Sequence, residues 1–379
     1  MNVLFDGRPI TKKNTSGIPE YAKLLFAELV RGKGTDENYV LFFNSFLKRE
    51  LPDDLKNLDF SIIQWGISNK IIEASSRFFR MPKIGRGGNV DVLLRPHFHP
   101  LCAARGVRDV VVFHDLSFVR FPNYFSKKKM IWHWSQDPKG QAQRADRIIA
   151  VSRATKEDIV GYYGIPEEKV FVVHSGINDF FREKIREEDS EEFRKRNGIA
   201  GRYVLFVGTL EPRKNVDGLI RAFSRLKEDE HFRDVTLIVV GARGWLYDNI
   251  FKEVTASRFS SDIRMWGHAS FEDLRYLYHG AHVFAYPSFF EGFGFPPLEA
   301  QACGVPVVAS SCGAHREILR DSAFLVDPKK DDDIVAALKV VIDDTKKRNE
   351  LSEEGKKNAE RFQWKHAAGE VRALIKDIL

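Results

Sequence analysis

Residues 291–308 read Glu-Gly-Phe-Gly-Phe-Pro-Pro-Leu-Glu-Ala-Gln-Ala-Cys-Gly-Val-Pro-Val-Val, and this stretch says most about the fold. The apolar run Val283–Ala285 before it predicts a buried β-strand, and Val305–Ala309 predicts the next strand. Pro296 or Pro297 is expected to open a helix between the two strands, because proline is favoured in a first helical turn. The stretch therefore predicts a strand–helix–strand unit, which is the building block of a parallel sheet.

The same alternation runs along the whole chain. Continuously apolar runs such as 204–207 and 236–240 are typical of strands buried on both faces of a parallel sheet. The expected strands are 2–6, 39–43, 60–64, 90–94, 110–114, 147–151, 170–174, 203–207, 235–240, 263–266, 283–285, 305–309 and 323–326, and the expected helices include 19–31, 153–163, 216–227, 271–280 and 332–347. We therefore expect the α/β class, with two facing Rossmann-like, doubly wound domains and a ligand cleft between them.

The domain boundary is expected near residue 180. Asp179–Arg202 interrupts the alternation, because it is dense in charge and has little β character. This divides the chain into a first domain, 1–180, and a second domain, 181–363. The last segment, 364–379, predicts an amphipathic helix that follows another helix rather than a strand. We expect it to cross back and complete the first domain.

Composition narrows the class of protein. A length of 379 residues suggests two domains, and 43% hydrophobic with 30% charged residues excludes disordered and collagen-like chains. The three cysteines form no C-x-x-C pair, which argues against a disulfide framework or a structural zinc site. The amino terminus does not have the pattern of a signal peptide, and no apolar run approaches the ~18 residues of a membrane span. We expect a soluble, cytoplasmic protein.

Positive charge is concentrated in one part of the chain. Residues 70–153 contain 16 Lys or Arg and 6 Asp or Glu, a balance of +10, whereas the net charge of the whole chain is +6. An anionic partner is therefore expected for the first domain. Substrate phosphates, an acidic lipid surface and a nucleic acid all satisfy this expectation.

The strand-end loop at residues 291–299 predicts an anion site. Gly292 and Gly294 leave backbone amides uncovered at the positive end of the following helix. Glu291 precedes that helix and Glu299 lies within it, so the two carboxylates can bind hydroxyls on either side of a bound phosphate. This arrangement suits a nucleotide sugar. A bare pair of glutamates at this spacing would more often be a dipole partner and a solvent-facing side chain.

A second strand-end loop, at 205–215, carries two cations. The strand ends at Gly208 and Thr209, and Arg213 and Lys214 precede a helix that Asn215 can cap. Arginine offers a bidentate fork and lysine a point charge, and both neutralise a diphosphate. The alternative is an ordinary solvated basic turn.

Further candidates follow other predicted strands. His114 and Asp115 come directly after 110–113, where a histidine can donate to a sugar hydroxyl. Gly17 lies in a glycine loop that includes Thr15 and Ser16 and leads into the helix at 19–31. Gly241 follows the strand at 235–240. Each of these has a purely structural interpretation as a turn or cap residue.

Taken together, these residues resemble the retaining GT-B glycosyltransferases of family 4, which include many bacterial mannosyltransferases. The resemblance extends from the Gly17 loop to the terminal helix, and its most specific parts are 205–215 and 291–299. One turn departs from the family pattern, because Ser175 and Asn178 stand where asparagine and aspartate are usual.

The resemblance implies a role for each candidate. His114, Arg213, Lys214 and Glu291 are implied as the catalytic group, in which His114 contacts the donor sugar, the two cations hold the diphosphate and Glu291 holds sugar hydroxyls. Glu299 is implied to hold the ribose. The implied donor-binding residues are Gly17, Gly208, Thr209, Gly241, Gly292, Phe293, Gly294 and Glu299.

The implied reaction transfers a hexose with retention of configuration. A phosphate oxygen of the donor accepts the proton of the attacking hydroxyl, and the protein positions the reactants and stabilises the departing diphosphate. GDP-mannose is the favoured donor, with UDP-glucose or a UDP-N-acetylhexosamine as the alternative. No cofactor or metal is expected, because Asp331–Asp333 opens a predicted helix and is interpreted as dipole chemistry.

The acceptor is expected to be a glycan or a lipid-linked glycan in polysaccharide synthesis. Within the basic segment 120–147, a run of lysines precedes Met-Ile-Trp-His-Trp. This segment can contact the inner face of a membrane peripherally or grip a lipid phosphate. The alternative is a helix with Trp132 in the core and the lysines in water. The candidates for the acceptor side are Asp115, Lys127, Lys128 and Lys129.

Three other classes of protein fit the sequence less well. A dinucleotide-dependent oxidoreductase would need G-x-G-x-x-G with an acidic residue ~20 positions later, and this pattern is lacking. A nucleic-acid-binding protein would leave the strand-end residues unexplained, so no nucleic-acid partner is expected. A catalytically silent glycan-binding relative is disfavoured by the retained Arg213, Lys214, Glu291 and Glu299.

Overall fold

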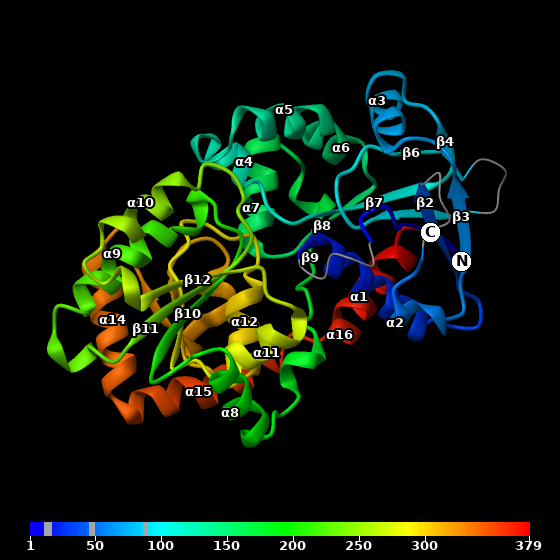
Figure 1. Cartoon of the computed structure of the whole chain (residues 1–379). Coiled ribbons are helices and arrows are strands. Elements are labelled where there is room, and N and C mark those ends of the chain that lie inside the picture. The colour runs from blue at the N-terminus through cyan, green and yellow to red at the C-terminus, as the bar shows by residue number, and fades with distance from the viewer. Residues whose placement is uncertain (11–16, 45–49, 86–89) are drawn as a thin grey trace. The chain divides into compact units, whose positions relative to one another are not determined.

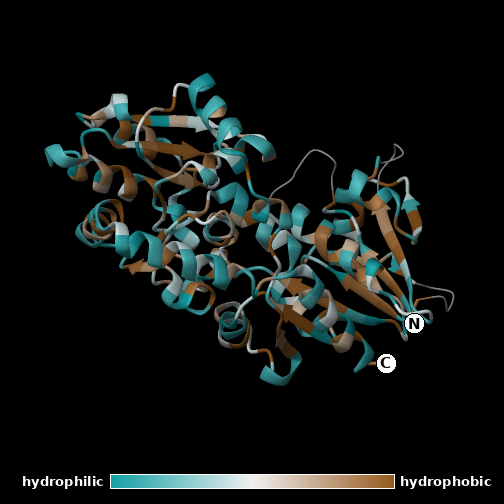
Figure 2. Ribbon diagram, turned by 90° about the horizontal axis from the view of Figure 1, so that it is seen from below, coloured by the Kyte–Doolittle hydropathy of each residue, from teal (hydrophilic) through white to brown (hydrophobic). Residues whose placement is uncertain are grey.

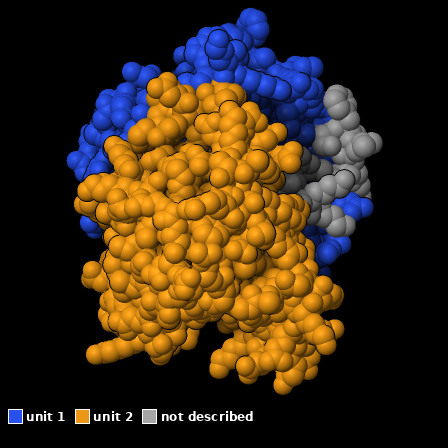
Figure 3. All heavy atoms as spheres, turned by 60° about the vertical axis from the view of Figure 1, so that its left-hand side comes forward, with its two compact units in different colours: residues 1–120, 127–176, 362–379 blue, residues 121–126, 177–361 orange. Residues whose placement is uncertain are grey.

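The computed structural model describes residues 1–10, 17–44, 50–85 and 90–379. Within these ranges the chain forms two compact units, coloured separately in Figure 3. Unit 1 contains residues 1–120, 127–176 and 362–379, and unit 2 contains residues 121–126 and 177–361.

Unit 1 is built on a parallel sheet of seven strands, which Figure 1 shows in blue, cyan and green. From edge to edge these are β3 (Ser61–Trp65), β2 (Asn38–Asn44), β1 (Asn2–Asp6), β5 (Val92–Arg95), β7 (Arg108–Phe113), β8 (Arg147–Ala150) and β9 (Val170–Val172). The chain moves outward from β1 in one direction, returns, and continues from β5 in the other. This order is that of a doubly wound Rossmann sheet. A separate ladder pairs β4 (Lys83–Ile84) with β6 (Cys102–Ala103).

Helices accompany this sheet. They are α1 (Ile18–Arg31), α2 (Asp53–Lys56), α3 (Asn69–Phe79), α4 (Ser117–Arg120), α5 (Lys127–Gln136), α6 (Pro138–Arg144), α7 (Arg153–Tyr163) and α16 (Trp364–Lys376). Helix α7 shows how local sequence sets such an element. The Ser152 hydroxyl accepts a hydrogen bond from the Thr155 amide at its start, and Gly164 ends it in the left-handed conformation.

Unit 2 repeats the arrangement with a parallel sheet of six strands. The strands, from edge to edge, are β12 (Ile263–Gly267), β11 (Thr236–Val240), β10 (Tyr203–Val207), β13 (Val283–Tyr286), β14 (Val307–Ser310) and β15 (Phe324–Val326). The helices are α8 (Glu187–Arg196), α9 (Val216–Leu226), α10 (Asp248–Ala256), α11 (Phe271–His279), α12 (Phe295–Ala302), α13 (His315–Leu319), α14 (Asp331–Asp343) and α15 (Thr345–Ala359). The prediction of two Rossmann-like α/β domains with parallel sheets is confirmed.

Apolar burial explains why these segments are strands. All five residues of β10 and all four of β13 are buried, and Figure 2 shows hydrophobic residues along the strands of both sheets. Burial of both faces removes the need for alternating polar residues. The continuous apolar runs therefore predicted strand positions to within a few residues.

Two local predictions are wrong. The helix expected at 332–347 is two helices, because Asp344 takes an extended conformation and its carboxylate caps α15 by accepting a hydrogen bond from the Lys347 amide. Asn215 occupies the N-cap position of α9 but makes no side-chain cap there. Its side-chain amide instead donates to the carbonyls of Pro287 and Pro328 at 3.1 and 2.8 Å.

The terminal helix α16 packs against α1 within unit 1. A Cβ added to Gly176 would lie 2.2 Å from the Trp364 backbone nitrogen, so the chain segments beside two of the four crossings between the units touch each other. Asn178, at the position that departs from the family pattern, accepts a hydrogen bond from the Phe180 amide at 3.0 Å. An aspartate would do the same, and the substitution therefore preserves the turn.

Residues 121–126 belong to unit 2, which the sequence did not indicate. Three of their rings pack on other rings of unit 2. Tyr124 stacks on Phe289 and Phe125 stacks on Trp245, whereas Phe121 packs at a tilt on Phe290. In addition, the Trp245 indole donates to the Tyr124 carbonyl at 2.7 Å. The basic segment 120–147 is therefore divided between the two units. None of the described helices is both long enough and apolar enough to cross a membrane.

Candidate active site

The candidate site in unit 2 lies where the strand order of the sheet reverses. Strands β10 and β13 are neighbours, but the chain runs from β10 away to β11 and β12 before it returns to β13. Loops that leave two such strands diverge to opposite faces and open a crevice at the carboxyl edge. The 205–215 loop follows β10 and the 291–299 loop follows β13, so the two most specific motifs meet at this point.

A buried cluster of charges joins the two loops. The Lys214 ammonium donates to Glu291 Oε1 at 2.7 Å and to the Tyr286 hydroxyl at 2.6 Å. Arg213 Nη1 lies 2.9 Å from Glu291 Oε2, and its Nη2 donates to Glu211 at 2.6 Å. Glu291 thus stands between the two cations that the sequence assigned to a diphosphate.

Electrostatics keep the Glu291 carboxylate ionised. Burial alone would raise the pKa of Glu291, but Arg213 and Lys214 outweigh that effect and hold the pKa at about 2. Burial and the neighbouring guanidinium lower the pKa of Lys214, whereas Glu291 opposes this change. Two cations and two carboxylates make the cluster neutral. An ammonium has three N–H bonds, and the contacts of Lys214 with the described residues use two of them. One donor therefore remains for a ligand.

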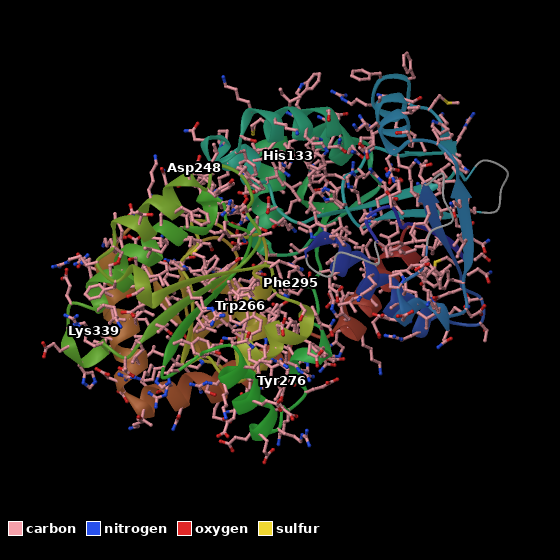
Figure 4. All side chains as sticks on the ribbon, in the orientation of Figure 1. His133, Asp248, Trp266, Tyr276, Phe295 and Lys339 are labelled. Atoms are coloured by element: carbon pink, nitrogen blue, oxygen red, sulfur yellow. The ribbon has the colours of Figure 1, made fainter. Side chains whose placement is uncertain are left out.

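The glycine loop before α12 presents backbone amides beside this cluster. Gly294 takes a left-handed conformation, with φ 98°, at the N-cap of α12, and Phe295 (labelled in Figure 4) is the first helical residue. Pro296 and Pro297 carry no N–H group, so the donors of this helix start come from residues 292–295. A backbone hydrogen bond holds the start of this loop in place, because the Ala314 amide donates to the Glu291 carbonyl at 3.0 Å.

Glu299 lies one helical turn further along α12 and is half-buried. Its carboxylate accepts a hydrogen bond from the Tyr278 hydroxyl at 2.9 Å. Burial, reinforced by Glu299, raises the pKa of Tyr278, so the hydroxyl stays protonated and remains a donor. The implied ribose contact of Glu299 remains a prediction.

Gly208, Thr209 and Gly241 lie close together, because they directly follow the neighbouring strands β10 and β11. The Gly208 amide donates to the Val240 carbonyl at 2.9 Å, and Thr209 is exposed at the edge of the site. A Cβ on Gly241 would lie 1.8 Å from the Gly208 carbonyl oxygen. Gly241 is therefore required for the close approach of these two loops, whatever its contact with a donor.

In unit 1, the structure brings His114 close to the helix that the Gly17 loop begins. Gly17 is the exposed N-cap of α1, with φ 66°, and Thr15 and Ser16 of the same predicted loop lie outside the described residues. Tyr21 of α1 packs edge-on against the His114 ring, with 4.6 Å between ring centroids. His114 Nε2 lies 2.8 Å from the Pro96 carbonyl oxygen, and burial lowers its pKa.

The candidates for the acceptor side occupy two different elements of unit 1. Asp115 Oδ1 accepts hydrogen bonds from the Ser117 amide and hydroxyl at 2.9 and 2.6 Å, at the start of α4. Its carboxylate is therefore engaged in a structural role that the sequence did not indicate. The basic candidates, which lie in the first turn of α5 and are exposed, are Lys127, Lys128 and Lys129.

Lys129 and Asp115 both influence the pKa of His133, a histidine of α5. Burial lowers the pKa of His133 to about 4, Asp115 opposes this change, and Lys129 adds to it. An acceptor contact of Lys129 or of its two neighbours remains a prediction. The alternative interpretation is wrong in placing Trp132 in the core, because Trp132 is 36% exposed. Its other two parts are confirmed, since the segment is helical and the three lysines are exposed.

Comparison with known proteins identifies the family. Residues 189–358 match the family of glycosyl transferases group 1, and residues 39–179 match glycosyltransferase family 4. The O-antigen chain mannosyltransferase B of Escherichia coli is 32% identical over 259 residues, which is 68% of each chain. The chain belongs to the family 4 glycosyltransferases.

Solved structures agree on the GT-B fold of this glycosyltransferase. HepE of Anabaena, crystallised with UDP and glucose, superposes with a TM-score of 0.72 at 18% identity and covers 100% of both chains. Sucrose-phosphate synthase of Thermosynechococcus elongatus superposes with a TM-score of 0.75 at 17% identity over 100% of this chain and 99% of the other.

The site of the glycosyltransferase includes a histidine that the sequence analysis missed. His315 begins α13 and is fully buried, and its Nδ1 lies 3.0 Å from the Ser310 hydroxyl. Its Nε2 has no hydrogen-bond partner among the described residues and would lie 3.0 Å from a Cβ at Gly294. The available signal was the short loop after the strand at 305–309, which ends at the same sheet edge.

His315 makes the stability of this glycosyltransferase sensitive to acid. Burial, together with nearby Lys214 and Arg213, lowers its pKa to about 4, which Glu291 only partly offsets. The unfolded chain, in which the pKa is about 6.5, therefore binds a proton that the folded chain does not. The free energy of unfolding falls as the pH falls from 6.5 toward 4.

We expect His315→Asn to weaken this pH dependence. Asparagine can keep a bond to Ser310 but has no group that titrates in this range. The melting temperature, measured from pH 7 to pH 5, should fall less steeply in the variant than in the wild type. His366→Gln, a change on an exposed residue of α16, should leave the slope as it is. An unchanged slope for His315→Asn would mean that the imidazole is already protonated in the folded protein.

Proposed function

We propose that this glycosyltransferase transfers mannose from GDP-mannose to a growing glycan or lipid-linked glycan during polysaccharide synthesis. The observation that carries the proposal is the buried Arg213–Glu291–Lys214 cluster at the switch point of unit 2. The choice of mannose rests on the O-antigen mannosyltransferase of Escherichia coli, with which the chain shares 32% identity.

The donor diphosphate binds at the carboxyl edge of β10 and β13. Arg213 and the remaining N–H of Lys214 meet the phosphate oxygens, and the amides of residues 292–295 add the positive end of α12. These cations take the place that a divalent metal has in other enzymes, and transfer is expected to persist in EDTA. Glu291 holds hydroxyls of the sugar.

The transferred sugar keeps its anomeric configuration in this proposal. The acceptor oxygen forms a bond to the anomeric carbon on the face from which the diphosphate leaves, and the carbon–phosphate oxygen bond breaks. The departing phosphate oxygen takes the acceptor proton, so the charges balance without a protein base. His114 contacts the donor sugar. Proton NMR of the first product, before any further reaction, distinguishes retention from inversion.

We expect GDP-mannose to stabilise the chain more than other nucleotide sugars do. A ligand present at 100 times its dissociation constant adds about 2.7 kcal/mol to the free energy of unfolding. This corresponds to a rise of several degrees in the melting temperature. The measurement is a thermal-shift series with GDP-mannose, UDP-glucose and UDP-N-acetylglucosamine, followed by an assay of GDP release with a mannan acceptor.

The alternatives give different results in the same experiment. A larger shift with either UDP-sugar would replace the donor but keep the glycosyltransferase site. A shift with release of no nucleotide, whatever the glycan acceptor, would favour a catalytically silent relative. If no nucleotide sugar changed the melting temperature, the proposed donor site would be wrong.

A further inference from the structure

Exposed apolar side chains gather in two segments of unit 1. Fourteen large apolar side chains are exposed among the described residues, of which seven lie in 62–81 and three in 131–134. Monomeric soluble proteins rarely expose contiguous apolar surface, because it costs free energy in water. A concentration of this kind therefore marks an interaction surface.

Helix α3 carries much of this surface. Ile71, Ala74 and Phe78 are spaced by three and four residues and form an exposed stripe along the helix. The buried face of α3 holds Ile72 and Ser76, and Ile72 belongs to a core cluster with Leu4 and other residues. One face of α3 thus contributes to the core, and the exposed stripe on the other face has no such role among the described residues.

Helix α5 extends the same surface. It packs against α3, and the two helices lie next to each other at the top of unit 1 in Figure 1. Its exposed apolar residues Ile131 and Trp134 are 66% and 65% exposed, and Phe78 and Phe79 at the end of α3 are 64% and 77% exposed. We call these four side chains, with Ile71 and Met81, the α3–α5 surface.

Basic residues surround the α3–α5 surface. Residues 69–83 and 127–139 contain eight lysines or arginines and only two acidic residues. Of the two acids, Asp137 is neutralised within unit 1, because it lies 2.9 Å from Arg77 and from Arg144. Glu73 lies 3.5 Å from the ring of His99. The charge that this part of unit 1 presents to solvent is therefore strongly positive.

A cavity next to α3 is lined by more basic than acidic side chains. Its volume is about 250 Å³, and its lining includes Arg77, Arg80, Lys83 and Arg144. Arg80 and Lys83 make no ion pair with any described residue and are exposed. Apolar side chains beside unpaired cations fit a membrane interface, where acyl chains lie beneath anionic headgroups. The apolar side chains would meet the acyl chains, and the cations would meet the headgroups.

We propose that the α3–α5 surface docks this protein on an anionic lipid bilayer. Phe78, Phe79 and Trp134 enter the boundary between headgroups and acyl chains, and the surrounding lysines and arginines attract the lipid phosphates. A second copy of the chain fits less well, because the basic rims of two copies would repel each other. The proposal goes beyond the transfer reaction and does not depend on the identity of the donor.

The test is co-sedimentation of the full chain with lipid vesicles. Binding is expected to vesicles of phosphatidylcholine with phosphatidylglycerol, to weaken as salt is raised, and to be slight with phosphatidylcholine alone. The double variant Phe78→Ser, Phe79→Ser should bind at least about tenfold more weakly, because it removes two membrane-inserting rings. Its melting temperature should not fall, since both rings are in water in the free protein.

Matched variants separate this surface from general effects. Tyr162→Ser removes an exposed ring elsewhere in unit 1 and should not change vesicle binding. Lys127→Glu with Lys128→Glu should abolish the preference for anionic vesicles, whereas Lys252→Glu with Lys365→Glu makes the same change of charge elsewhere and should not.

Several results would overturn the proposal. These are failure of the wild type to bind anionic vesicles, equal binding by the phenylalanine variant, and a dimer in light scattering that this variant converts to a monomer. Release of GDP from GDP-mannose with a soluble mannan acceptor is measured separately. Failure of docking is therefore distinguishable from failure of the proposed transfer reaction.

Discussion

Replacing Glu291 by glutamine is expected to lower kcat/KM for sugar transfer by about 100-fold to 1,000-fold, the usual cost of losing one well-placed group that stabilises charge. The Glu291 carboxylate lies 2.7 Å from the Lys214 ammonium and 2.9 Å from the Arg213 guanidinium. Without its charge the two cations repel each other and lose the geometry in which they meet a diphosphate. The glutamine amide is also a weaker acceptor for sugar hydroxyls.

Glutamine is a better test than alanine at this position. Residue 291 is only 7% exposed, so an alanine there would disturb the fold as well as the transfer reaction. Alanine would remove the carboxylate that the two buried cations share, and breaking a buried ion pair costs about 3–5 kcal/mol. A loss of activity could then reflect unfolding.

The measurement is the initial rate of GDP release with saturating acceptor, together with the melting temperature. Glu272→Gln, an exposed change at the start of α11, serves as the control and should retain full activity. Should Glu291→Gln stay within a few-fold of the wild type, Glu291 would be only a structural counter-ion for Lys214 and Arg213.

Much of the fold follows from the sequence, because burial leaves a direct mark on it. The five residues 203–207 are apolar without interruption, and β10 has the bounds expected from them. A break in a helix leaves a weaker mark. Asp344 ends α14 and caps α15, but an aspartate within a charged helical period does not reveal which of these roles it takes. Helix α3 was not among the expected helices, although its apolar residues recur at helical spacing.

The sequence predicted which residues form the candidate site, but not which ion pairs they make with one another. Arg213, Lys214 and Glu291 follow strands that end at one sheet edge, and this follows from the sequence pattern. Their mutual ion pairing depends on distances of less than 3 Å, which spacing along the chain does not determine. His315 was overlooked for a related reason, since only the fold shows that its Nε2 is buried beside Gly294.

Gly241→Ala is expected to cost about 3–5 kcal/mol of stability, the range of severe backbone and overpacking changes, and to lower the melting temperature by about 10 °C or more. The added Cβ would lie 1.8 Å from the Gly208 carbonyl oxygen and 2.7 Å from its carbonyl carbon. Both are backbone atoms at the end of a central strand, so neither can yield as a flexible side chain would. The Gly241 amide is also held, because it donates to the Gly267 carbonyl at 2.7 Å.

Gly161→Ala is the matched change with the opposite expected sign. Gly161 lies within α7, and no atom lies within 4 Å of an added Cβ. Alanine there should raise stability by about 0.5–1 kcal/mol, because it restricts the unfolded chain and favours the helix. The measurement is the melting temperature of each variant compared with that of the wild type. A Gly241→Ala protein as stable as the wild type would show that the ends of β10 and β11 can separate, and the donor loops at Gly208 and Thr209 would then not be held in the geometry on which the proposed diphosphate site depends.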